Sequence, residues 1–244
     1  RAGQADYFQA TKGGGHGDYH LVVFAPASVQ ESIDLMSVAF DTADKYQCPV
    51  MIVADGMICQ MMEPVELPEM HEYTVDLEKK PWAANGHGFS KKAGRTIINS
   101  MYINTEDLTV HNEDLQAIYR KIEANEVRYE AYNMENAEII VTAFGTVARI
   151  AKSAIDELKE EGINIGMLRP ITLWPFPYKE LHDAGTAPGV KAVLDVELNA
   201  GQMLEDVKLA MNGDNKVDFF GHYGSQMPTP EEIKAKLLSM REVL

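Results

Sequence analysis

The chain has 244 residues, 45% of them hydrophobic, and its 22 basic and 37 acidic side chains give a net charge of −15. This composition is typical of a globular protein of one or two domains, and the acidic balance argues against nucleic-acid binding, which depends on Lys and Arg at phosphates. No apolar stretch is long enough to cross a bilayer, and two cysteines are too few for a disulfide scaffold, a zinc site or an iron–sulfur cluster. We therefore expect a cytoplasmic protein that contacts no membrane.

The first part of the chain predicts a βαβ unit. Two short apolar runs, residues 21–25 and 49–54, are typical of parallel strands buried on both faces. Between them, Ser28 and Glu31 have the spacing of a capping box, in which the Glu31 side chain returns to the backbone of Ser28. The helix should run to about residue 46 and bury one apolar face. That face consists of Ile33, Met36, Phe40 and Ala43.

The middle of the chain has no clear periodicity. From about residue 61 to residue 104, Pro and Gly interrupt a polar segment that is too long for an ordinary loop inside one domain. We interpret it as an arm that lies over another protein surface. A helix beginning at residue 104 or 105 follows, and its charged end, residues 123–130, should be solvated.

The last part predicts a second α/β module. Apolar strands alternate with helices, and Thr229 and Pro230 mark the start of the final helix. The expected strands are residues 138–145, 163–168, 190–197 and 217–220. Because the first module has too few strands to close its own sheet, either the sequence is a fragment or other residues complete that sheet.

Residues 169–177, Arg-Pro-Ile-Thr-Leu-Trp-Pro-Phe-Pro, are the most unusual stretch. Three prolines favour an extended backbone, and Trp174 and Phe176 present large apolar surfaces that must be covered. The segment is either a strand exit buried in its own domain or a platform for a second domain or subunit.

Motifs with a known chemistry are absent: there is no P-loop, dinucleotide-binding fingerprint, nucleophile elbow or zinc-protease motif. The turn at Gly145 and Thr146 can bind an anion at a helix N-terminus or be an ordinary tight turn. His16, in the glycine-rich loop of residues 12–18, is the most site-like histidine, although a flexible connection is the simpler interpretation of that loop. Glu197 and Asn199 follow a strand where α/β sheets place ligands, or they form a surface turn with a satisfied carboxylate.

Five motifs together resemble the alpha subunits of 2-oxoacid:ferredoxin oxidoreductases, most of all the branched-chain, 2-oxoisovalerate type. The motifs are residues 4–19 (Gln-Ala-Asp-Tyr-Phe-Gln-Ala-Thr-Lys-Gly-Gly-Gly-His-Gly-Asp-Tyr), 54–56 (Ala-Asp-Gly), 169–177, 197–202 (Glu-Leu-Asn-Ala-Gly-Gln) and 228–232 (Pro-Thr-Pro-Glu-Glu). The resemblance implies an α/β fold of two parallel-sheet modules. Residues 1–65 would be part of a thiamine-pyrimidine-binding-type domain, residues 66–132 a connecting arm and helix, and residues 133–244 a complete transketolase C-terminal-like domain.

The resemblance also implies a function. A branched-chain 2-oxoacid would be oxidatively decarboxylated to acyl-CoA, with electrons passed to ferredoxin. Thiamine diphosphate and magnesium would be bound jointly with a partner, the iron–sulfur clusters would lie only in partner subunits, and the partners would be beta, gamma and delta subunits. The alternatives are the same chemistry on 2-oxoglutarate or pyruvate, and a non-catalytic subunit-docking module.

Three sets of site residues follow from the resemblance, and none of them is a metal ligand. They are Arg1, His16 and Asp18 as catalytic residues; Gly15 and Gly17 as cofactor-binding residues; and Trp174, Phe176, Glu197 and Asn199 as interface residues. One departure affects these assignments, because the family's Tyr-Pro-Ile-Thr-Pro-like motif and its aminopyrimidine-binding glutamate are not in this sequence.

Overall fold

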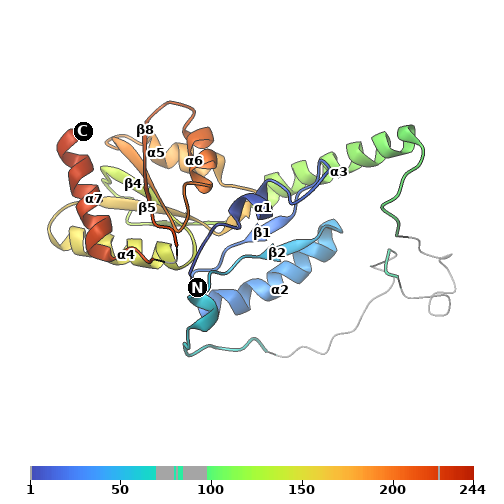
Figure 1. Ribbon diagram of the computed structural model, residues 1–244, viewed down its shortest axis with the longest axis horizontal. Helices are drawn as coiled ribbons and strands as arrows, with labels where there is room; N and C mark the ends of the chain where they lie inside the picture. Colours follow the sequence, from blue (N-terminus) through green and yellow to red (C-terminus); the bar gives the residue numbers. More distant parts are fainter. Residues whose placement is uncertain (1, 70–79, 81, 85–97, 225) are drawn as a thin grey trace. The chain divides into compact units, whose positions relative to one another are not determined.

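The computed structural model describes residues 2–69, 80, 82–84, 98–224 and 226–244. The chain divides into a larger unit, Arg1–Glu66 with Ala117–Leu244, and a smaller unit, Leu67–Gln116. Both β-sheets belong to the larger unit (Figure 1). Within the described ranges, no helix has the length and apolar character needed to span a membrane.

The larger sheet has five strands in the order β3-β5-β4-β7-β8. Four strands are parallel, and β3 pairs with β5 in the antiparallel direction. Every residue of β4, β5 and β7 is buried, as expected of central strands covered on both faces. The strands are β3 (Tyr129–Tyr132), β4 (Ile139–Thr142), β5 (Ile165–Pro170), β7 (Ala192–Glu197) and β8 (Lys216–Gly221).

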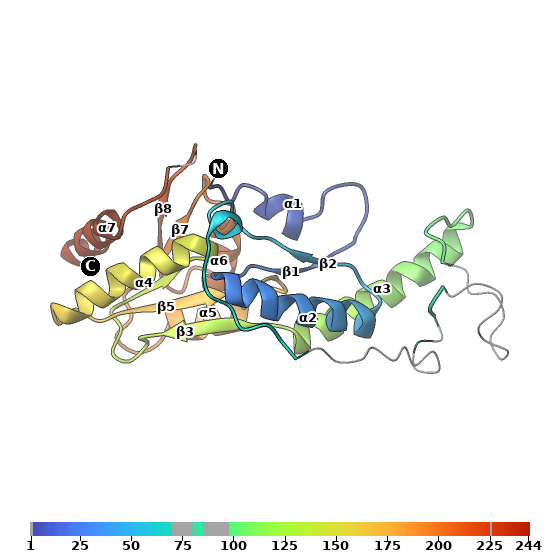
Figure 2. The same cartoon turned by 90° about the horizontal axis from the view of Figure 1, so that it is seen from below.

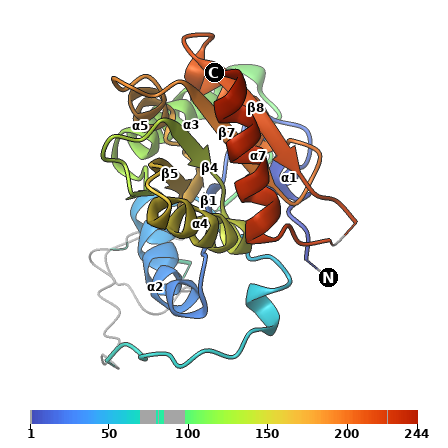
Figure 3. The same cartoon turned by 90° about the vertical axis from the view of Figure 1, so that its left-hand side faces the viewer.

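Helices cover this sheet in two pairs. The helices α4 (Gly145–Glu160) and α7 (Pro230–Val243) lie side by side (Figure 3). Their apolar residues join those of β4, β5 and β7 in one core. The helices α5 (Tyr178–Gly185) and α6 (Met203–Met211) form the second pair. Thr229 and Glu232 form the capping box at the start of α7, which confirms the predicted helix start.

The smaller sheet has three strands in the order β2-β1-β6. The strands β1 (Val22–Phe24) and β2 (Val50–Ile52) are parallel and are joined by α2 (Val29–Tyr46), which confirms the predicted βαβ unit (Figure 2). The third strand, β6 (Thr172–Trp174), is antiparallel to β1. The predicted α/β class is confirmed, and each sheet also contains one antiparallel strand that the sequence pattern did not indicate.

Residues 169–177 cross from one sheet to the other. Pro170 ends β5 in the larger sheet and Thr172 begins β6 in the smaller one, so that only Ile171 lies between them. The Ile171 carbonyl accepts a hydrogen bond from Ala25 N at 2.8 Å, and its N–H donates to the Arg128 carbonyl at 2.9 Å. The segment is extended as predicted, and within this chain it supplies a strand to the sheet of the other module.

The start of α2 differs from the predicted capping box. The Ser28 side chain accepts a hydrogen bond from Glu31 N at 3.0 Å, as expected. The Glu31 carboxylate, however, accepts from Ala27 N at 2.6 Å and not from Ser28. The prediction was wrong by one residue, because the carboxylate also binds a distant arginine that draws it toward Ala27.

The buried face of α2 was also partly mispredicted. Leu35, Ala39 and Thr42 are the buried residues of the helix. Met36 and Phe40, expected in the core, are 52% and 66% exposed. Ile33 and Ala43 are half-buried, so none of the four residues predicted for the buried face is buried, although the helix itself forms as predicted.

The charged segment of residues 123–130, at and after the end of α3 (Thr105–Asn125), is solvated only in part, because residues 123–125, 128 and 129 are exposed as predicted but Glu126 is buried. Glu126 is only 5% exposed and accepts hydrogen bonds from Lys45 Nζ at 2.7 Å and Tyr46 Oη at 2.8 Å. Residues 129–132 form β3, which the sequence pattern did not predict. Three further short elements were also missed, namely α1 (Tyr7–Thr11), η1 (Ile58–Gln60) and α5.

The described residues of the predicted arm, 61–69, 80, 82–84 and 98–104, contain no helix or strand. The rest of the arm lies outside the described residues, and the surface that it covers stays a prediction.

Candidate functional site

The segment that leads into the glycine loop is held at the carboxyl ends of β4 and β7. Gln4 is 3% exposed, and its side chain donates to the Phe144 carbonyl at 2.8 Å and accepts from Leu198 N at 3.1 Å. Its backbone N–H donates to the Leu198 carbonyl at 3.2 Å. The first residues of the chain are thereby attached to the edge of the larger sheet where α/β folds place ligands.

Glu197 and Asn199 complete this attachment. The Asn199 side chain donates to the Gln4 carbonyl at 2.9 Å and to the Glu197 carboxylate at 2.8 Å. Glu197 also accepts from Met203 N at 2.9 Å and Leu204 N at 3.0 Å, at the positive end of α6. Glu197 is therefore a satisfied carboxylate, but it is fully buried and not in a surface turn. An interface role for these two residues stays a prediction.

The glycine loop is exposed. Gly17 has a φ of +131°, and a Cβ there would approach the Tyr19 ring at 3.3 Å, so the backbone itself requires glycine. Tyr19 Oη accepts a hydrogen bond from Gly14 N at 3.0 Å and braces the loop. His16 and Asp18 lie on the exposed side of this loop, and Gly15 lies beside them. Catalytic and cofactor-binding roles for these residues stay predictions, and Arg1 lies outside the described residues.

Trp174 and Phe176 are buried within the chain. The Trp174 ring stacks on His20, with ring centroids 4.6 Å apart, and meets the edge of Tyr119. Burial lowers the pKa of His20, which favours a neutral ring in this aromatic cluster. Phe176 is 4% exposed and packs against Tyr178. Both side chains belong to residues 169–177, the segment that crosses between the sheets, and both are buried. Their contact with a partner subunit stays a prediction.

Asp55 occupies the anion position at the start of α4. Its carboxylate accepts from Thr146 N at 2.7 Å and from Thr146 Oγ1 at 2.6 Å. Gly145 has a φ of +60°, and a Cβ there would lie 2.6 Å from Asp55 Oδ2. The turn therefore does bind an anion at a helix N-terminus, but the anion is a side chain of this chain, from the Ala-Asp-Gly motif.

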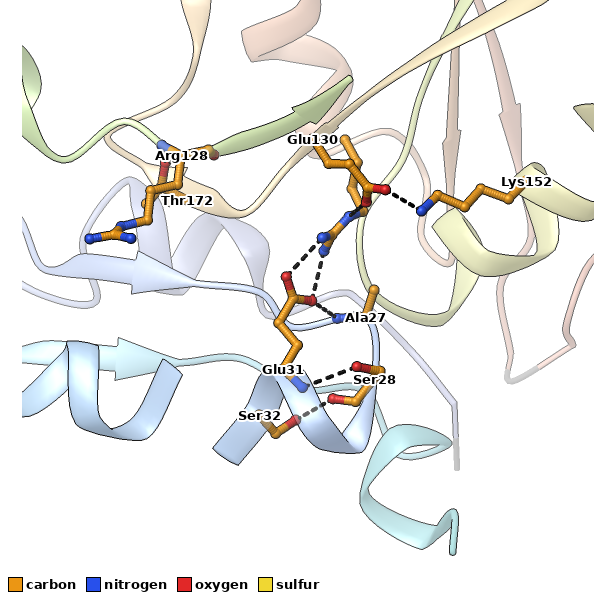
Figure 4. Close-up of polar contacts among 9 residues, drawn as sticks. Ala27, Ser28, Glu31, Ser32, Arg128, Glu130, Lys152 and Thr172 are labelled. Atoms are coloured by element: carbon orange, nitrogen blue, oxygen red, sulfur yellow. Dashed lines mark hydrogen bonds and ion pairs between the residues drawn. The ribbon is translucent and has the colours of Figure 1, made fainter. Parts of the chain in front are cut away.

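A second polar junction surrounds Arg169, which is 5% exposed. Figure 4 shows the side chains of Glu31, Glu130 and Lys152 that take part in it. The Arg169 guanidinium donates two hydrogen bonds to Glu31, at 2.9 and 2.8 Å, and one to Glu130 at 2.8 Å. Lys152 forms a further ion pair with Glu130. Burial acts to raise the pKa of Glu130, but Lys152 and Arg169 outweigh it and hold that pKa below its usual value. The junction links α2, β3 and α4 through charges that compensate one another.

One buried acid has no partner. Both carboxylate oxygens of Asp195, and the hydroxyl of its register neighbour Thr142, lack a hydrogen bond among the described residues. Burial, and then the neighbouring Glu197, raise the pKa of Asp195 well above its usual value. Asp195 is therefore favoured in its protonated form inside the larger sheet.

The structure thus connects the predicted residues only in part. Glu197 and Asn199 bind the segment that precedes the loop of His16 and Asp18. Trp174 stacks on His20, and Phe176 packs against Tyr178. Sequence reasoning missed the role of Asp55, although it identified the Ala-Asp-Gly motif that contains it. Among the residues described, no group of three or more His, Cys, Asp or Glu side chains is arranged to hold a metal ion.

Two family models match the chain in succession. The model described as "Pyruvate flavodoxin/ferredoxin oxidoreductase, thiamine diP-bdg" matches residues 1–131. The model described as "Pyruvate:ferredoxin oxidoreductase core domain II" matches residues 137–233.

The chain is also similar to curated proteins over nearly its full length. Ketoisovalerate oxidoreductase subunit VorB of Methanothermobacter marburgensis is 42% identical, over 96% of this chain and 64% of the relative. 2-oxoglutarate synthase subunit KorA of Methanocaldococcus jannaschii is 30% identical, over 97% of this chain and 68% of the relative. This chain therefore spans slightly less than two thirds of the ketoisovalerate relative.

A solved structure has the same fold. It is 2-oxoglutarate:ferredoxin oxidoreductase from Magnetococcus marinus, with a TM-score of 0.74 and 18% identity, and the match covers 98% of this chain and 45% of that one. At this identity the similarity concerns the fold alone.

Proposed function

Because this chain belongs to the pyruvate flavodoxin/ferredoxin oxidoreductase family, we propose that it is the alpha subunit of an enzyme that oxidatively decarboxylates 2-oxoisovalerate. The carboxylate leaves as carbon dioxide, the remaining acyl group is transferred to coenzyme A, and two electrons pass one at a time to ferredoxin. The observation that carries the substrate is the 42% identity to a ketoisovalerate oxidoreductase subunit, against 30% to a 2-oxoglutarate synthase subunit.

The cofactor of this reaction is thiamine diphosphate, which stabilises the carbanion formed when carbon dioxide leaves. The glycine loop is exposed in this chain, so a partner subunit can reach it, which supports a cofactor site shared between subunits. A beta subunit supplies the diphosphate and magnesium site, and iron–sulfur clusters in the other subunits carry the electrons. Within this chain, the hydrogen bonds of Gln4, Glu197 and Asn199 attach the segment that precedes the glycine loop to the larger sheet.

The proposed partners are beta, gamma and delta subunits, with ferredoxin as electron acceptor, in the cytoplasm. Both cysteines, Cys48 and Cys59, are free thiols, which suits a reducing compartment.

Reconstitution tests the function. The full-length protein is co-expressed with the other three subunits, and viologen reduction is measured with coenzyme A and 2-oxoisovalerate, 2-oxoglutarate or pyruvate. We expect the highest kcat/KM with 2-oxoisovalerate. A higher value with another 2-oxoacid would overturn the substrate assignment. No reduction with any of them, in a complex that assembles, would leave the chain as a subunit-docking module.

His16 gives a test inside the chain. If it lines the cofactor site, His16→Ala lowers kcat while assembly and melting temperature stay unchanged. His182→Ala is the matched control, because His182 is also accessible and pairs with Asp214 at 2.9 Å on the second module. Equal activities of the two variants would remove His16 from the site.

A further inference from the structure

One buried carboxylate receives donors from two other elements and from the start of the glycine loop. Asp206, on α6, is 1% exposed. It accepts from Tyr7 Oη of α1 at 2.6 Å and from Tyr178 Oη of α5 at 2.5 Å. Lys12, the C-cap residue of α1, forms an ion pair with the same carboxylate.

This arrangement satisfies a buried charge that would otherwise be costly. A desolvated carboxylate needs hydrogen bonds and a compensating cation, and here two hydroxyls and one ammonium group supply them. Burial, and then the Asp206 carboxylate, raise the pKa of Tyr7 well above its usual value, and the same causes raise the pKa of Tyr178. Both tyrosines therefore stay protonated at neutral pH and act as hydrogen-bond donors.

The contacts on α1 lie at both ends of that helix. Tyr7 is the first residue of α1, and Lys12 follows its last residue. Gly13, the first glycine of the loop, has a φ of +92°. Phe8 N also donates to Gln202 Oε1 at 3.0 Å, immediately before α6. Beyond this point the loop residues 13–17 are exposed or half-buried. Contacts with α6, which belongs to the second module, thus fix the position at which the glycine loop begins.

We infer that Asp206 is a positioning residue for the glycine loop, residues 13–17, because it joins both ends of α1 to α6 through Tyr7 and Lys12. Asp206 acts by holding the residue from which the loop starts, and so sets the position of His16. The consequence for catalysis rests on the proposed function, whereas the restraint on the loop does not.

Hydrogen exchange tests the restraint independently of activity. In the assembled complex, Asp206→Asn should speed hydrogen exchange on the order of tenfold at the hydrogen-bonded amides of Phe8, Ala10, Lys12 and Gly14, because it loses a charge-assisted contact. Exchange in β4 and β7 should be unchanged. Trypsin should also cut faster after Lys12. Unchanged exchange at these four amides and unchanged cleavage would overturn the inference.

Matched variants separate positioning from general stability. Asp218→Asn is the control, because Asp218 pairs with Lys236 at 2.8 Å on another part of the second module. It should leave exchange in the loop unchanged, and Asp206→Glu should restore much of the protection. If Asp206→Asn does not assemble, Lys12→Gln removes only the half-exposed cation and should give the same faster exchange at the amides of Phe8, Ala10 and Gly14. A loop unaffected by Lys12→Gln would then count against the inference.

Activity provides the second arm. Asp206→Asn should lower kcat for the 2-oxoacid with little change in KM, and Asp206→Glu should recover it. If the wild-type complex has no activity, the proposed function is contradicted. The hydrogen-exchange result still decides the role of Asp206 in that case. Faster loop exchange with an unchanged kcat would overturn the link to catalysis and not the restraint.

Discussion

The two sheets of the larger unit differ in how completely they are covered. The five-stranded sheet has three strands in which every residue is buried, and α4, α7 and their neighbours enclose its core. In the three-stranded sheet β1 is buried, but β2 is half-buried and forms an edge. Beside β2 lies an apolar groove of about 290 Å³. It is lined by Met36, Ala39, Phe40, Ala43, Val50 and Ile52.

From this comparison we expect one module to be stabilised by its own core and the other to depend on contacts made across the crossing segment. The smaller sheet takes β6 from residues that follow directly on β5. It is also joined to the second module by Arg169 with Glu31 and by Asp55 with Thr146. If the first module, which contains the three-stranded sheet, relies on these junctions, substitutions at the junctions should destabilise it more than substitutions on its own apolar surface.

The largest effect is expected at Arg169. Arg169→Met leaves the carboxylates of Glu31 and Glu130 without their shared cation, although Lys152 still pairs with Glu130. Because both carboxylates are partly buried, we expect a loss at the lower end for buried ion pairs, about 3 kcal/mol. Urea unfolding measures the loss. Lys179→Met, which removes a highly exposed ion pair with Asp183, is the control and should change the midpoint little. Similar midpoints for both variants would show that the junction does not stabilise the fold.

The next effect is expected at Asp55. Asp55→Ala removes the carboxylate that accepts two hydrogen bonds from Thr146, and the buried N-terminus of α4 loses its anion, at a cost of about 2–3 kcal/mol. Asp55→Asn keeps one acceptor oxygen and should cost less. Thermal unfolding of both variants checks the order. An Asp55→Asn variant as stable as the unchanged protein would exclude a contribution of the charge.

Asp195 should make stability depend on pH in the larger sheet. Its pKa is raised by burial and by Glu197, so the folded state retains a proton that the unfolded chain releases above its usual pKa of about 4. The stabilisation that this proton contributes is present at low pH. It is lost as the pH rises toward the pKa of Asp195 in the folded protein. Asp195→Asn should therefore raise the melting temperature at neutral pH and flatten its decline between acidic and neutral pH. A parallel decline in the variant would contradict the assignment.

The smallest effect is expected on the exposed face of α2. Phe40→Ser in the isolated chain should change stability by no more than about 0.5 kcal/mol, because the side chain is already 66% exposed. Leu35→Ala, at a 6% exposed position of the same helix, is the matched core variant and should cost about 2–5 kcal/mol. Repeating both in the assembled complex sharpens the comparison, since a larger loss for Phe40→Ser there would indicate that a partner covers the groove.

Much of the local structure could be predicted from the sequence. The βαβ unit of β1, α2 and β2, the strands β4, β5, β7 and β8, and the capped start of α7 follow from apolar periodicity and capping residues, which act over a few neighbouring positions. The five motifs also identified the family correctly, because together they span nearly the whole chain in order.

The tertiary structure alone decided where those elements pair and which polar groups meet. Nothing local distinguishes a strand that stays in one sheet from residues 165–174, which divide between two sheets after Pro170. Glu31 has the spacing of a capping partner, but Arg169, 138 residues away, determines where its carboxylate points. In the same way, Asp55 and Asp206 acquire their roles only through Thr146, Tyr7 and Lys12. Burial and ion pairing depend on contacts between distant segments, and a sequence pattern does not specify those contacts.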